Sequence, residues 1–134
     1  MGKNLPKSEQ RETNIAPWLS VSNAAEAINY YREAFGVEEL YRLNDDDGKP
    51  VVAQLSIGGA DFWIQEDADS SLDNANKRSV RMIVTVNDPD SMFAQALAAG
   101  AVEVAPVSEN YGWRVGRLVD PFGQHWEIGK PLSR

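Results

Sequence analysis

Apolar and polar positions follow the same order twice along this chain, once in each half. A short alternating run of the strand type comes first, and an amphipathic segment with helical period follows it. Three further alternating runs, separated by turn residues, complete each half. The pattern therefore predicts two βαβββ modules, over residues 14–65 and 80–129.

In the first module, Asn23 precedes the helical segment as a predicted N-cap, and Gly36 follows it as a C-terminal stop. The apolar residues between them have the spacing of one helix face. The strands predicted in this module are 15–21, 38–43, 51–57 and 60–65.

In the second module, Asp88 is the predicted N-cap and Gly100 the stop. Equivalent residues of the two modules lie 65 positions apart before the helix, as Val21 and Val86 do. They lie 64 apart after it, as Gly36 and Gly100 do. The strands predicted in this module are 80–86, 101–104, 115–119 and 124–129.

The remaining segments are polar and lack an apolar period. We interpret residues 1–13 as a flexible arm, 66–79 as a linker and 130–134 as a C-terminal tail, outside one domain over 14–129. The acidic stretch 44–48 lacks the spacing of a calcium loop and is interpreted as a solvated hairpin turn.

The chain has 134 residues, one His, no Cys and a formal net charge of −7. The absence of Cys excludes disulfides and thiolate chemistry, and a single His excludes sites that need two imidazoles. The acidic surplus argues against nucleic acid, and the apolar runs are too short to span a membrane. No signal-peptide pattern opens the chain, so we expect a cytoplasmic protein.

Two stretches of the sequence carry a resemblance: APWLSV…AINYYREAFGVEEL in the first module and GRLVDPFGQHWEI near the end. They are similar to the vicinal oxygen chelate superfamily of glyoxalases, bleomycin-resistance proteins and extradiol dioxygenases, in particular to its PhnB-like branch. The resemblance covers residues 14–129. It implies an α+β fold of two βαβββ modules that form a U-shaped mixed sheet, with helices on the convex side and a ligand cleft on the concave side. It also implies a homodimer.

In metal-dependent members of this superfamily, the first and last strands of each module supply the metal ligands. Those positions fall on Ala16, Trp63, Arg81 and Glu127, and the internal repeat relates the two pairs by its offsets of 65 and 64. Of the four, only Glu127 can bind a divalent cation, and Arg81 would repel one. We therefore expect no metal ion, no cofactor, and no glyoxalase I, fosfomycin-transferase or dioxygenase activity.

Strand alternation places residues on two opposite faces. One face is wholly apolar and is expected to pack under the helices: Leu19, Val21, Phe62, Ile64, Met82, Val84, Val86, Trp126 and Ile128. The other face is polar and aromatic and is the predicted cleft: Ala16, Trp18, Ser20, Trp63, Gln65, Arg81, Ile83, Thr85, His125 and Glu127.

Arg81 and Glu127 are expected to converge, either as an ion pair that links the modules or as a ligand site. In the second case Arg81 holds a carboxylate or phosphate and Glu127 orients it. His125 is either a surface or sheet-edge residue or, with Glu127, a candidate catalytic base. Arg114 and Arg117 are expected to be solvated or paired with carboxylates.

Aromatic side chains are the other candidate ligand contacts. Trp18 and Trp63 lie on the predicted cleft face, with packing in a dimer interface as the alternative. Tyr111 and Trp113 belong to a predicted loop, 109–113, that overhangs the cleft. There they either stack on a ligand or pack against another molecule.

Three functions are compatible with these residues. The first is a metal-independent binding protein of the bleomycin-resistance type, which sequesters an aromatic or cationic small molecule. The second is a metal-free enzyme acting on an anionic small molecule, with Arg81 as the anion anchor and His125 or Glu127 as the base. The third is an interaction module whose own side chains fill the cleft. Fold alone does not choose among them, so whether the chain is an enzyme stays open.

Overall fold

The computed structural model describes residues 14–68 and 80–132, and its elements follow the predicted order. The predicted arm 1–13 and most of the predicted linker 66–79 lie outside the described residues. The first module comprises β1 (Trp18–Val21), α1 (Ala24–Phe35), β2 (Glu38–Asn44), β3 (Pro50–Ile57) and β4 (Ala60–Glu66). The second comprises β5 (Arg81–Thr85), α2 (Pro89–Ala99), β6 (Val102–Asn110), β7 (Trp113–Val119) and β8 (His125–Pro131).

Both helices begin at the caps that the sequence predicts. The side-chain oxygen of Asn23 accepts a hydrogen bond from the backbone N–H of Glu26 at 3.0 Å. Asp88 accepts one from the N–H of Ser91 at 3.1 Å. At the end of α1, Gly36 has a φ of 67°, a conformation that a residue with a side chain adopts reluctantly.

The strand bounds differ from the prediction mainly at one hairpin and at the end of the chain. β6 reaches Asn110 and β7 begins at Trp113, so the predicted loop 109–113 is a two-residue hairpin turn. β6 is an edge strand exposed along most of its length, and its sequence therefore lacks the apolar alternation of a half-buried strand. β8 ends at Pro131, inside the predicted tail 130–134.

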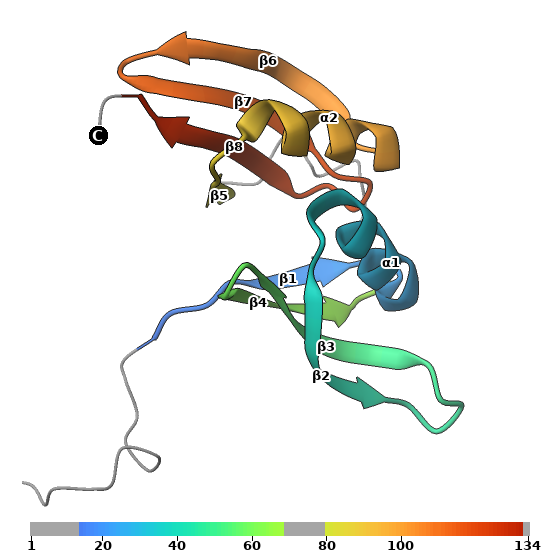
Figure 1. Ribbon diagram of the computed structural model, residues 1–134. Coiled ribbons are helices and arrows are strands. Elements are labelled where there is room, and N and C mark those ends of the chain that lie inside the picture. The colour runs from blue at the N-terminus through green and yellow to red at the C-terminus, as the bar shows by residue number, and fades with distance from the viewer. Residues whose placement is uncertain (1–13, 69–79, 133–134) are drawn as a thin grey trace, which may run out of the picture.

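The eight strands form two four-stranded sheets, in the orders β1-β4-β3-β2 and β5-β8-β7-β6 (Figure 1). The first and last strands of each module pair in parallel, and the other neighbours pair antiparallel. The α+β fold of two βαβββ modules is therefore confirmed. Within residues 14–68 and 80–132 no ladder joins the sheets, so the expected U-shaped sheet is divided into two halves.

The two modules share one hydrophobic core. The helices α1 and α2 pack against each other, and the helix-facing sides of both sheets meet around them. The ring of Trp126 lies 4.6 Å from that of Phe35 and 5.6 Å from that of Phe62, measured between centroids. All nine residues predicted for this face are buried or packed against the core: Leu19, Val21, Phe62, Ile64, Met82, Val84, Val86, Trp126 and Ile128.

A buried carboxylate adds a polar link between the modules. Asp120, which is 2% exposed, accepts hydrogen bonds from the hydroxyl of Tyr31 at 2.6 Å and from the indole N–H of Trp126 at 2.8 Å. The backbone N–H groups of Phe122 and Gln124 donate to its other oxygen at 2.9 Å each. Burial raises the pKa of Asp120, and these hydrogen bonds oppose that rise. Because Tyr31 lies on α1, this bond joins the first module to the second.

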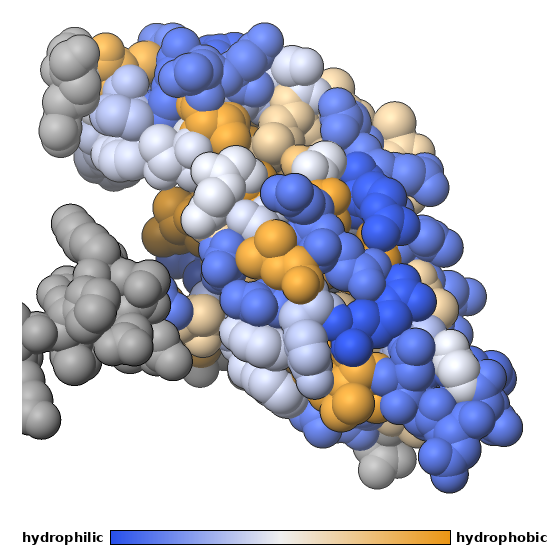
Figure 2. Space-filling view, turned by 60° about the horizontal axis from the view of Figure 1, so that its bottom comes forward, coloured by the Kyte–Doolittle hydropathy of each residue, from blue (hydrophilic) through white to orange (hydrophobic). Residues whose placement is uncertain are grey.

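Hydrophilic residues cover much of the face seen in Figure 2. Figure 2 shows apolar patches that are separated from one another by hydrophilic residues. No helix in the described part of the chain is long and apolar enough to cross a membrane.

Candidate ligand site

The predicted cleft residues lie on the sheet faces opposite the helices. Because the helix-facing sides of both sheets meet in the common core, the other faces are directed away from it, one on each sheet. Ala16, just before β1, with Trp18, Ser20, Trp63 and Gln65, belongs to the first module. The second sheet carries Arg81, Ile83, Thr85, His125 and Glu127. The predicted cleft residues are therefore distributed over two sheets of one chain.

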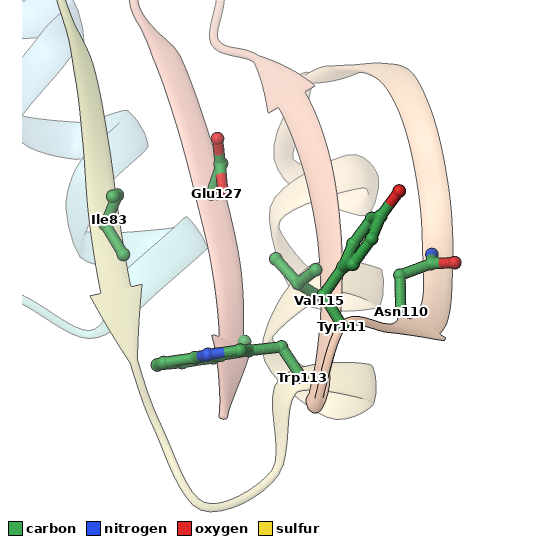
Figure 3. A pocket seen from close by; sticks show the side chains of 7 residues that line it. Ile83, Asn110, Tyr111, Trp113, Val115 and Glu127 are labelled. Atoms are coloured by element: carbon green, nitrogen blue, oxygen red, sulfur yellow. The ribbon is translucent and has the colours of Figure 1, made fainter. Parts of the chain in front are cut away.

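A hollow of about 270 Å³ lies on the outward face of the second sheet (Figure 3). It is lined by Ile83, Asn110, Tyr111, Trp113, Val115, Glu127 and Gly129. Figure 3 shows the indole of Trp113 directed across β8 toward β5, where Ile83 lies. Tyr111 is fully exposed and Ile83 is 68% exposed. The hollow thus combines an open apolar wall with two polar groups, the carboxylate of Glu127 and the amide of Asn110.

Tyr111 occupies a strained position at the edge of this hollow. Its φ is 53° and that of Gly112 is 82°, in the turn between the register partners Asn110 and Trp113. Two successive positive φ angles are typical of a type I′ hairpin turn, which favours Asn, Asp or Gly at its first position. No other non-glycine residue in the described segments has a positive φ. The backbone of Tyr111 is therefore strained, and this conformation places a large aromatic ring beside the hollow.

Arg81 and Glu127 converge as the sequence predicts. Nη1 of Arg81 lies 3.0 Å from Oε2 of Glu127, and their side chains are 46% and 21% exposed. Both residues belong to the second module, so their ion pair links β5 to β8. The predicted link between the two modules is therefore not formed by this pair. Arg81 also borders a second hollow of about 270 Å³, which includes Pro17 and Asp61 from the first module.

His125 is buried, with 8% exposure, rather than at the surface or the sheet edge. β8 lies between β5 and β7, and His125 is in register with Arg81 on one side and Val119 on the other. Its place on an inner strand accounts for the burial of an imidazole that the sequence alone placed at the rim. Nη2 of Arg117 is 3.4 Å from Nδ1 of His125, which is a long contact for a hydrogen bond.

The two arginines of β7 differ in their partners. Arg114 donates to Asp90 from Nε at 2.7 Å and lies 3.5 Å from Glu109, as predicted. Arg117 forms no ion pair with a carboxylate in the described segments, and its buried Nε has no hydrogen-bond partner there. Of the two alternatives predicted for Arg117, pairing with a carboxylate is not found in these segments, and the residue is half-buried. Glu127, its register partner, pairs with Arg81 instead.

Trp18 and Trp63 lie on the first sheet, apart from the hollow that Glu127 lines. Their rings stack with centroids 5.9 Å apart and an interplanar angle of 21°. Tyr41 extends this group, with its ring 5.9 Å from that of Trp63. Trp18 is 53% exposed and Tyr41 is 48% exposed, so this aromatic face is open to solvent.

Comparison with known proteins assigns the fold to a family. Residues 18–129 match the glyoxalase-like domain. The chain belongs to the glyoxalase-like family. It is also 35% identical over 129 residues to an uncharacterized protein of Mycobacterium bovis, covering 90% of this chain and 85% of that protein.

Solved structures share the fold of this glyoxalase-like chain. TioX from Micromonospora sp. ML1 has a TM-score of 0.72 and 23% identity, covering 90% of this chain and 100% of that one. The PhnB protein from Bacillus cereus has a TM-score of 0.67 and 20% identity, with coverages of 90% and 100%. A glyoxalase/bleomycin resistance protein/dioxygenase family enzyme from Burkholderia phytofirmans PsJN has a TM-score of 0.65 and 19% identity, covering 86% and 95%. The predicted superfamily, with PhnB-like neighbours, is confirmed.

The residues of this glyoxalase-like chain do not fit the metal centre found in some superfamily members. Arg81 places a permanent positive charge 3.0 Å from Glu127, the one carboxylate at the expected positions. Ala16 offers no ligand atom, and Trp63 stacks on Trp18. No group of three or more His, Cys, Asp or Glu within the described ranges is arranged to hold a metal ion.

Some lining residues were not among the predicted site residues. Ile83 was placed on the predicted cleft face but not assigned a role. Asn110, in the predicted loop 109–113, and Val115, in the predicted strand 115–119, were not assigned to the site. Gly129 continues the face of Glu127 two residues later. A Cβ there would come within 2.7 Å of the carbonyl oxygen of Arg114, so a side chain does not fit without a shift. A glycine inside a predicted strand is the one signal that could have indicated this open floor.

Proposed function

We propose that this glyoxalase-like protein binds a small organic molecule with a flat apolar part in the hollow of the second sheet, without a metal ion. The observation that carries the proposal is the exposed aromatic and aliphatic wall formed by Tyr111, Trp113 and Ile83 around the hollow. Apolar side chains left open at a concave site lose solvent-exposed area when a ligand covers them. The amide of Asn110 supplies a polar contact that orients the ligand.

The geometry favours binding over turnover. The carboxylate of Glu127 is engaged by Arg81, and His125 is buried beside Arg117. A general base needs an accessible atom within hydrogen-bond reach of the substrate proton. Sequestration of the ligand, as in a bleomycin-resistance type of protein, therefore describes this site better than the enzyme alternative.

We expect a second copy of the chain to complete the site. Within one chain, the aromatic face of Trp18, Trp63 and Tyr41 is open to solvent, and the hollow on the other sheet is lined by exposed side chains such as Tyr111 and Ile83. In a two-fold symmetric dimer, the aromatic face of each copy can cover the hollow of the other. The symmetry then forms this contact two times in each dimer. This arrangement brings Trp18 and Trp63 to the ligand as the sequence predicted, but from the partner.

Equilibrium dialysis with 2-naphthylmethanol, a flat neutral probe, tests the binding proposal. We expect Trp113→Ala to weaken binding about fivefold, because it removes one stacking surface. Val102→Ala, which changes an exposed apolar residue at the far end of the same sheet, is the matched control and should leave the affinity unchanged. An unmeasurable affinity of the natural chain up to the solubility limit, or equal losses in both variants, would contradict the proposal.

A further inference from the structure

Arg117 is a cation without a matching anion in the described part of the chain. Its buried Nε–H has no acceptor among those residues, and its Nη2 approaches Nδ1 of His125 at 3.4 Å. Arg114, three residues earlier on the same strand, has carboxylate acceptors for its guanidinium group. It donates to both carboxylate oxygens of Asp90 and approaches Glu109.

The surroundings of Arg117 carry an excess of positive charge. Register places Glu127 beside it on β8, and His125 is the next residue on that face of β8. Arg81 of β5 binds the carboxylate of Glu127. Two guanidinium groups therefore face one carboxylate, in a protein whose net charge is −7. An unpaired, partly buried charge is costly, and such a cost is offset when an anion binds.

We propose that Arg117, together with Arg81, holds an acidic group of the ligand, so that the ligand is a flat aromatic acid. This inference rests on the proposed function, because the flat part of the same ligand occupies the hollow. A carboxylate and a phosphate monoester share the required chemistry, since arginine can hold either with two parallel hydrogen bonds. Because Nε is buried, this contact is made by the terminal nitrogens of Arg117, one of which, Nη2, also approaches His125 at 3.4 Å.

The positions of the two parts of the site support one ligand that spans both. Glu127 and Ile83 line the hollow, and register puts Arg117 in the same cross-strand row as these two residues. Val115, another lining residue, lies two positions before Arg117 and on the same face of β7. Neighbouring strands are about 4.8 Å apart and alternate residues about 7 Å apart, so Arg117 lies within the length of a small aromatic acid from the hollow.

Matched naphthalene probes test this inference by equilibrium dialysis. They share one ring system and differ in the attached group: 2-naphthylmethanol is neutral, 2-naphthoate carries a carboxylate and 2-naphthyl phosphate carries a phosphate. We expect at least one acid to bind the natural chain about tenfold more tightly than the alcohol. The tighter acid identifies the group that the site selects. Equal affinity for the alcohol and both acids overturns the inference.

Variants assign the preference to Arg117. Arg117→Gln should abolish the advantage of the acid over the alcohol and leave the affinity for the alcohol unchanged, whereas Arg117→Lys should keep part of the advantage because it keeps the charge. Arg114→Gln, on the opposite face of β7, is the control and should retain the full advantage. If Arg117→Gln weakens acid and alcohol equally while circular dichroism shows it folded, the inference is wrong. The wild-type comparison of probes remains decisive if that variant does not fold.

The two proposals fail differently. If no probe binds, or if Trp113→Ala leaves all affinities unchanged, the hollow is not the ligand site and the proposed function fails. If the probes bind in a manner that depends on Trp113 but without preference for an acid, only the role of Arg117 fails.

Discussion

The outward faces of the two sheets show how one repeated module has acquired two different surfaces. Ala16 and Trp63 in the first module stand where Arg81 and Glu127 stand in the second, at offsets of 65 and 64. The first sheet therefore presents stacked aromatic rings, and the second an ion pair beside a hollow. Their helix-facing sides remain alike, because both are apolar and enter one core. Packing constrains one face of each sheet, and the other face is free to specialise.

The largest effect should come from the turn that precedes the last strand of each module. Asp120 is buried with four hydrogen bonds, whereas Ser56, 64 positions earlier, is a buried residue of β3 in the first module. We expect Asp120→Ala to lower the free energy of unfolding by about 3 kcal/mol, because it leaves several buried hydrogen-bond donors without an acceptor. Ser56→Ala should lower it by less than about 1 kcal/mol. Urea unfolding measures both, and similar losses would show that Asp120 is not the special link between modules.

The same carboxylate predicts a dependence of stability on pH. Burial raises the pKa of Asp120 above that of the unfolded chain, despite the opposing hydrogen bonds. The folded state then binds a proton more readily than the unfolded state does. The contribution of Asp120 to stability is therefore present below the unfolded carboxyl pKa, about 3.9, and declines as the pH rises toward the folded value.

Urea unfolding of the natural chain and of Asp120→Asn between about pH 3.5 and pH 7 checks this sign. The advantage of the natural chain should shrink as the pH rises. An advantage that grows with pH would mean that the four hydrogen bonds outweigh burial.

A smaller effect is expected at the ion pair that distinguishes the second module. Arg81→Ala should destabilise the chain by about 1 kcal/mol or less, because the arginine is nearly half exposed and solvent screens the pair. Arg81→Met/Glu127→Leu should restore most of that loss, since no unpaired charge remains. Thermal unfolding of the two variants compares them. A double variant less stable than Arg81→Ala would give the pair a structural role that exceeds its exposure.

The smallest effect concerns the turn that carries Tyr111. The equivalent turn of the first module has Asp47 before Gly48, 64 positions before Tyr111 and Gly112. Tyr111→Asn gives the second turn a residue that favours a positive φ, so we expect a gain of about 0.5 kcal/mol in stability. The same change removes an aromatic wall of the hollow and should weaken binding of 2-naphthylmethanol. A variant that is both less stable and equally good at binding would contradict the account of this turn.

Most of the fold could be predicted because it depends on local patterns. Asn23 and Asp88 cap the helices through contacts within three residues, and alternation alone placed Trp126 in the core and Glu127 on the opposite face. The division into two sheets could not be predicted, since it depends on how the modules pack rather than on either module's sequence.

The candidate site was less predictable because its features depend on neighbours across strands. His125 is buried because β8 is an inner strand, and sequence alternation does not reveal strand order. Within 14–68 and 80–132 Arg117 forms no ion pair with a carboxylate, because its register partner Glu127 binds Arg81. Only the sheet register reveals this competition. Tyr111 and Trp113 were predicted from their place in a loop beside the cleft, but the turn that holds them is defined only by the register of β6 and β7.

A mixing experiment tests the central claim, that each ligand site combines the hollow of one copy with the aromatic face of another. One chain carries Trp113→Ala and the other carries Trp18→Ala/Trp63→Ala, and the two are refolded together. Each mixed dimer then has one intact site, so random pairing should restore tight binding of 2-naphthylmethanol to about a quarter of all sites. No recovery in a mixture that light scattering shows to be dimeric would contradict the claim.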